Sequence, residues 1–153
     1  MGVSVLHKPN KPKKPIIPGQ ISTHKVPRYL GIPNIEEGHL AWRFSNADIT
    51  GPYSCGAFSY ADFQLLWDKL RSYEKMNVAK LREANSFHPM AVVNASREAK
   101  SRLQLLQLDD IDMLYSFHIT SACRLWCMKH SNILSILWWD TEHKVYPVGK
   151  RHT

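Results

Sequence analysis

The sequence contains little cysteine, and its three cysteines do not have the spacing of a metal or redox motif. Cys55, Cys123 and Cys127 are an odd number and form no CxxC pair, which argues against a secreted disulfide scaffold. Cys123 and Cys127 are expected on one face of a strand. We interpret the cysteines as small apolar core residues, with a metal or redox site as the alternative.

Long apolar runs and internal repeats are also missing. No run approaches the roughly 18 residues that a membrane span requires, and no secretory apolar segment follows Met1. We therefore expect a cytoplasmic protein without a membrane partner. With 153 residues and 44% hydrophobic residues, the chain is long enough for one domain with a substantial core.

Acidic residues are absent from positions 1–35, which hold six of the nine prolines and six lysine or arginine residues. Repeated proline prevents helix and ladder formation, so we predict a largely extended or disordered basic arm at 1–35 and a folded domain at 36–153. The arm carries most of the net charge of +7, and the body is nearly neutral. The arm is interpreted as a solubilising tail, or as an electrostatic aid in holding RNA or an acidic partner.

Hydrophobic periodicity predicts an α+β domain. Ser59 can cap a helix with Asp62 in the capping-box position, and apolar residues follow at helical spacing. Phe87-His88-Pro89 should end a second, shorter helix, because the residue before proline disfavours helix. The expected elements are a strand at 40–45, helices at 59–73, 78–84 and 96–106, and antiparallel strands at 114–119, 123–129 and 133–139.

The last 41 residues, 113–153, are the best candidate for a functional site. They hold half of the eight histidines and carry five basic but only two acidic side chains. Trp138 and Trp139 should face opposite sides of the last strand. We interpret both as core residues. The alternative is that one of them is a platform on which another ring stacks.

Two motifs in this body resemble a known family. Residues 138–147 read W-x-D-x-x-H-x-V-Y-P, and residues 58–70 read F-S-x-x-D-F-x-x-L-x-x-K-L. Together with the order of a strand, helices and three antiparallel strands, they resemble a branch of the RelE/ParE toxin superfamily over residues 40–147. The resemblance implies an N-terminal strand and two to three helices packed on a small antiparallel sheet. The chain departs from the family in its basic arm, its longer helical insert and its nearly neutral body.

The resemblance also implies a function. A RelE-like toxin would cleave mRNA, with or without the ribosome, and would be neutralised by a cognate antitoxin protein. The superfamily also contains members that act on a protein, so a RelE-fold module that binds a protein partner without nuclease activity is the alternative. A small RNA-binding accessory protein with a basic tail is a third possibility.

Metal-independent cleavage by the 2′-OH needs a proton acceptor, a proton donor and cations around the phosphate, so no cofactor is expected. Histidine suits both proton roles, arginine can clamp a phosphate, and tyrosine can stack on a base. For Arg124, a structural role as the partner of Asp140 or Glu142 is as well supported as a role in catalysis. The candidate catalytic residues are His118, Arg124, His143 and Tyr146. The candidate RNA-binding residues are Lys129, Lys144, Lys150 and Arg151.

Overall fold

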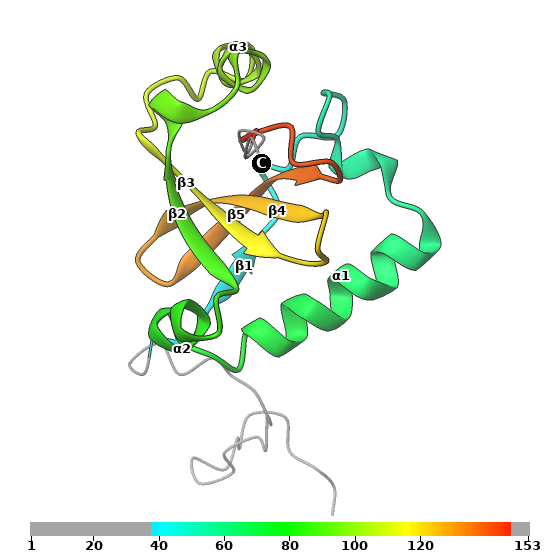
Figure 1. The fold of residues 1–153 in the computed structure, drawn as a ribbon, viewed down its shortest axis with the longest axis vertical. Coiled ribbons are helices and arrows are strands. Elements are labelled where there is room, and N and C mark those ends of the chain that lie inside the picture. Colours follow the sequence, from blue (N-terminus) through cyan, green and yellow to red (C-terminus); the bar gives the residue numbers. More distant parts are fainter. Residues whose placement is uncertain (1–37, 148–153) are drawn as a thin grey trace, which may run out of the picture. The chain divides into compact units, whose positions relative to one another are not determined.

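The domain is built on a five-stranded sheet with the strand order β1-β5-β4-β3-β2 (Figure 1). The computed structural model describes residues 38–147, so the predicted arm at 1–35 and the candidates Lys150 and Arg151 lie outside the described residues. The strands are β1 (Ala41–Arg43), β2 (Phe87–Ala91), β3 (Met113–His118), β4 (Arg124–His130) and β5 (Ile133–Asp140). The helices are α1 (Tyr60–Tyr73), α2 (Val78–Glu83) and α3 (Arg97–Leu105), with short 3-10 turns at Cys55–Ala57 and Val92–Asn94. The α+β class is therefore confirmed.

The start of α1 is fixed by the capping box that the sequence predicts. The Ser59 hydroxyl accepts a hydrogen bond from the Asp62 amide at 3.1 Å, and the Asp62 carboxylate accepts one from the Ser59 amide at 3.0 Å. These two bonds satisfy two of the amides that a helix start leaves unpaired. Three residues of α1 at helical spacing are buried: Leu66, Leu70 and Tyr73.

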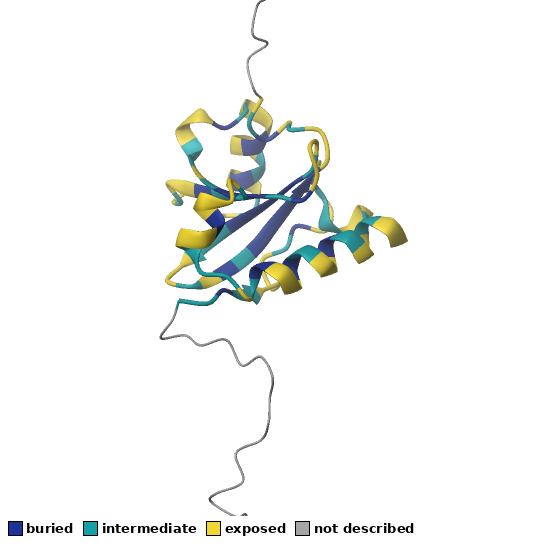
Figure 2. Cartoon of the chain, turned by 60° about the horizontal axis from the view of Figure 1, so that its bottom comes forward, coloured by how far each residue is buried: buried dark blue, intermediate teal, exposed yellow. Residues whose placement is uncertain are grey.

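The sheet is covered on both faces, and each face has its own core (Figure 2). One core joins α1 and α2 to the sheet through residues such as Leu70, Leu81 and Phe117. The other core joins α3 to the sheet through Leu103 and Trp138. Side chains alternate along a strand, so most sheet residues can be assigned to the α1/α2 face or to the α3 face; the exception is a bulge in β5, where Leu137 and Trp138 both lie in the core on the α3 face.

Two features of the sheet go beyond the expected antiparallel hairpins. β1 pairs in parallel with β5, so the sheet is mixed. β2 forms where the sequence indicated only the end of a helix, and it lies at the edge of the sheet beside β3. Pro89 is compatible with this strand, because an edge strand can spare the ladder hydrogen bond that proline cannot donate.

Both tryptophans at the end of β5 belong to the core, as predicted. Trp138 is completely buried in the core on the α3 face, and Trp139 is buried in the core on the α1/α2 face. The cysteines also pack with the core on the α1/α2 face, and Cys127 is fully buried. Burial raises the pKa of Cys55 to about 12, so that thiol stays protonated.

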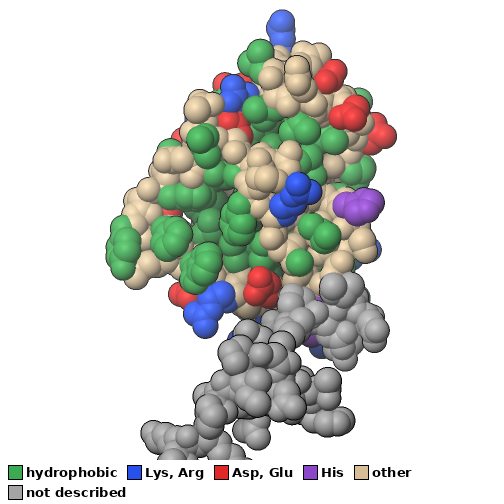
Figure 3. Space-filling view, turned by 180° about the vertical axis from the view of Figure 1, so that it is seen from behind, with side chains coloured by type: hydrophobic (Ala, Val, Ile, Leu, Met, Phe, Trp, Pro, Cys, Tyr) green, Lys and Arg blue, Asp and Glu red, His purple; other side chains and the backbone are tan. Residues whose placement is uncertain are grey.

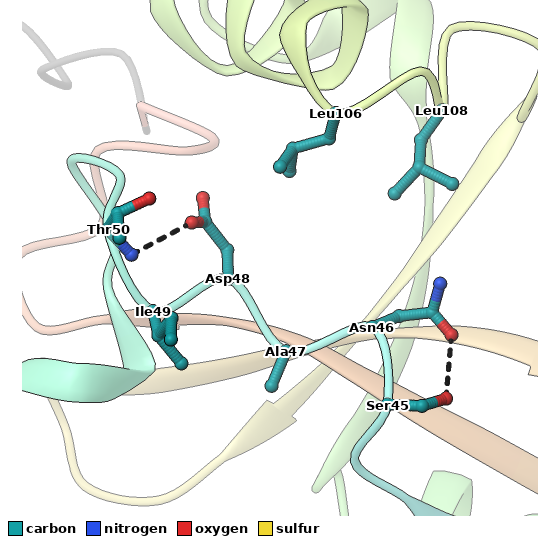
Figure 4. A pocket seen from close by; sticks show the side chains of 8 residues that line it. All are labelled: Ser45, Asn46, Ala47, Asp48, Ile49, Thr50, Leu106 and Leu108. Atoms are coloured by element: carbon teal, nitrogen blue, oxygen red, sulfur yellow. Dashed lines mark hydrogen bonds between the residues drawn. The ribbon is translucent and has the colours of Figure 1, made fainter.

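A buried ion pair ties the loop after β1 to α3 and β5. Asp48 accepts two hydrogen bonds from the Arg102 guanidinium, at 2.8 and 2.7 Å, and one from the Trp138 indole at 3.1 Å. The same carboxylate accepts the Thr50 amide (Figure 4) and the Gly51 amide. The Arg102 hydrogen bond is the main reason why the pKa of Asp48 falls to about 2. Asp48 is therefore ionised and fully engaged, which makes it a structural residue.

Within residues 38–147, no helix has both the length and the apolar character that crossing a membrane would require.

Candidate functional site

Three polar residues form a row across one end of the sheet on its α3 face. In the strand register, His118 of β3 lies opposite Arg124 of β4, and Arg124 lies opposite Asp140 of β5. Their neighbours Phe117, Leu125 and Trp139 point into the core on the other face. Strand alternation thus places the predicted pair His118 and Arg124 side by side on one face.

His118 lies in a positively charged environment. Burial, Arg124, His88 and His143 all lower its pKa, in that order of effect, to about 4. The loop that carries His143 begins after Asp140, which lies opposite Arg124, at this end of the sheet. At neutral pH the His118 imidazole is therefore uncharged and able to accept a proton.

His88 is a member of this cluster that the sequence did not indicate. Its ring centroid lies 4.8 Å from that of His118, and it sits on the same face of the neighbouring strand β2. Because β2 was not predicted, no pattern placed His88 beside the candidate residues.

Arg124 is buried, and its guanidinium holds the β3–β4 hairpin. Its NH1 group donates to the carbonyls of Thr120 at 2.8 Å, Cys123 at 2.9 Å and Ser121 at 3.4 Å. Within residues 38–147, all hydrogen bonds from this side chain come from NH1, which leaves Nε and NH2 available to a ligand. Arg124 therefore has a structural role and retains donors for a second one.

Asp140 shapes the loop that carries His143. Its buried carboxylate accepts the amides of Lys144 and Val145, both at 2.9 Å, and that of Glu142 at 3.3 Å. His143 adopts a left-handed backbone conformation, with φ of 57°, inside this ring of bonds. A non-glycine residue in that region is uncommon, so the loop presents His143 in a specified rather than an arbitrary position. The aspartate of the W-x-D-x-x-H motif was the available signal for this role.

The other candidates are placed less favourably for binding a phosphate. Tyr146 is half-buried and packs against the core on the α3 face. Lys144 forms an ion pair with Glu142 at 3.0 Å. Lys129 lies at the opposite end of β4, on the α1/α2 face, with its ammonium 5.9 Å from the Tyr115 ring centroid. The structure therefore places His118 and Arg124 side by side, carries His143 on the loop that follows Asp140 at the same end of the sheet, and leaves Lys129 apart.

A surface pocket is lined by His143. Its lining also includes Glu98, Glu142 and Lys144. Two carboxylates and one paired lysine do not favour a phosphate in this pocket. Among the described residues there is no group of three or more His, Cys, Asp or Glu side chains placed to hold a metal ion.

Comparison with known proteins gives no relatives: no family model, no curated protein and no solved structure matches this chain.

The shifted His118 predicts a pH dependence of stability. Because the folded pKa of about 4 lies below the ordinary value of 6.5, the unfolded chain binds the proton more readily between these values. This contribution is therefore absent above pH 6.5 and destabilises the fold increasingly as the pH falls to 4.

Urea unfolding at several pH values between 7 and 4 measures the effect. The His118→Gln variant should lose less stability over this range than the parent. His130→Gln, which changes an exposed histidine at the other end of β4, serves as the control and should follow the parent. Parallel pH profiles for the parent and His118→Gln would show that His118 titrates normally.

Proposed function

We propose that this protein is the toxin of a toxin–antitoxin system, a RelE-like endoribonuclease that cleaves mRNA by attack of a 2′-OH on the adjacent phosphate. The observation that carries the proposal is the pairing of His118 with Arg124 on one face of the sheet, at the end where the loop after Asp140 carries His143. The partners are mRNA, with the ribosome as the place of cleavage, and a cognate antitoxin that covers the site.

The residues divide the chemistry as follows. Neutral His118 takes the proton of the 2′-OH, while a new bond forms between the 2′-oxygen and phosphorus. The free Nε and NH2 donors of Arg124 hold the phosphate oxygens as negative charge develops. The bond from phosphorus to the 5′-oxygen breaks, and His143 in its protonated form supplies the proton to that oxygen. Tyr146, three residues farther on, is assigned to stacking on a neighbouring base.

Inducible expression in a bacterium tests the proposal. The parent should arrest growth, and His143→Ala should relieve the arrest. His130→Ala is the matched control, because His130 is exposed at the far end of β4 and should leave the arrest intact. Absence of arrest by the parent, or equal arrest by parent and His143→Ala, would reject these assignments.

A specific observation favours the protein-binding module as the second candidate. Four large aromatic side chains on and beside α1 are half exposed or more: Phe44 at 54%, Tyr60 at 77%, Phe63 at 51% and Trp67 at 50%. Figure 3 shows hydrophobic side chains gathered on the side of the molecule where α1 lies. Exposed aromatic surface of this kind commonly marks a protein interface. Growth arrest that survives loss of His143 but not replacement of Phe63 and Trp67 by serine would select this function.

A further inference from the structure

His88 has a position that the proposed chemistry does not use. It lies on the edge strand β2, its ring plane makes an angle of 41° with that of His118, and the ring centroids are 4.8 Å apart. Both histidines are partly exposed, so a ligand from solvent can reach the pair.

The orientation of the His88 ring is fixed by a backbone carbonyl. Its Nε2 lies 3.2 Å from the carbonyl oxygen of Asn85, a residue in the left-handed conformation with φ of 53°. A carbonyl oxygen only accepts hydrogen bonds, so Nε2 carries the hydrogen and donates. Nδ1 is then the atom left for a ligand, and it becomes a donor when the ring is protonated.

Groups that can donate hydrogen bonds to an anion lie beside the pair. His118 is flanked by His88 on β2 and by Arg124 on β4. The carboxylate in this row is Asp140, and its oxygens already accept three amides and the Trp126 indole. An anion beside His118 would receive donors from both neighbouring strands.

We propose that His88, His118 and Arg124 together form a binding site for one phosphate group, with His88 as a direct ligand through Nδ1. Assigning that phosphate to the RNA backbone rests on the proposed nuclease function, whereas the binding of phosphate itself does not.

Nitrogen-15 NMR of the histidine rings, with inorganic phosphate as the titrant at pH 6, tests the site on the full chain. The ring signals of His88 and His118 should shift together and saturate. His88→Asn should weaken phosphate binding by about tenfold, the loss expected for one charge-assisted hydrogen bond. His130→Asn, which changes an exposed histidine outside the cluster, should bind phosphate like the parent.

The outcomes separate this inference from the proposed function. Shifts confined to histidines other than His88, or unchanged affinity in His88→Asn, would overturn the His88 site even if the protein cleaves RNA. Saturable phosphate binding that depends on His88, in a protein without nuclease activity, would establish the phosphate site and reject the proposed nuclease function. An unshifted HSQC backbone spectrum of His88→Asn shows that the variant is folded.

Discussion

Replacing Arg102 by methionine is expected to lower the free energy of unfolding by about 3–5 kcal/mol, because the charged partner of a buried carboxylate is lost. Asp48 has only 1% of its side chain exposed, and Arg102 supplies two of its five hydrogen bonds. The methionine side chain preserves much of the packing against the loop but leaves the charge of Asp48 uncompensated. Urea unfolding at pH 7 measures the change.

The matched control is Arg71→Met on α1. Arg71 is also paired with an aspartate, Asp68 at 3.8 Å, but both side chains are largely exposed, at 66% and 76%. Such a pair contributes about 0–1 kcal/mol, so this variant should unfold close to the parent. Equal decreases in the free energy of unfolding for Arg102→Met and Arg71→Met would contradict the structural role assigned to the pair of Asp48 and Arg102.

The pH dependence gives a second check on the same residue. Asp48 has a folded pKa of about 2 and an ordinary value of 3.8, so its contribution to stability is present above pH 4 and is lost as the pH falls toward 2. The stability difference between the parent and Arg102→Met should therefore narrow over that interval.

Replacing His118 or His143 by glutamine is expected to reduce mRNA cleavage by about 10²- to 10⁴-fold in kcat, the usual loss on removal of a general acid or base. Glutamine keeps a polar side chain of similar size and removes the titrating ring. The measurement is single-turnover cleavage of mRNA on ribosomes, with unfolding curves for each variant to show that the fold is intact.

The control for these variants is Lys129→Gln. Lys129 lies at the other end of β4 and on the other face of the sheet, so its loss should leave kcat within a few-fold of the parent. A parent-like kcat for both histidine variants would contradict their proton-transfer roles.

The elements that depend on nearby residues could be predicted from the sequence. The capping box of Ser59 and Asp62 and the apolar spacing of α1 are local signals, and α1 begins directly after Ser59. Alternation with Leu125, which packs in the core on the α1/α2 face, is also a local pattern and gives the face of Arg124. The parallel pairing of β1 with β5 depends on contacts between residues about ninety positions apart, and no local pattern encodes it.

The site could be predicted only in part, for the same reason. His118 and Arg124 were recognisable as candidates because they flank one hairpin. His88 lies beside His118 because β2 pairs with β3, and β2 was not predicted because Pro89 indicated the end of a helix. The ion pair of Lys144 with Glu142 was not expected either, because two exposed side chains in one loop can pair or separate equally well. Asp140 was considered as a partner of Arg124, and the structure adds its bonds to the His143 loop.

The chemistry of the product ends tests the central claim most directly. Purified protein is incubated with ribosome-bound mRNA, and the new ends are identified by enzymatic treatment and mass spectrometry. Attack by the 2′-OH predicts a 2′,3′-cyclic phosphate on the upstream fragment and a 5′-hydroxyl on the downstream fragment, and both should disappear with His118→Gln. Intact mRNA, or fragments with 5′-phosphate ends, would contradict the account.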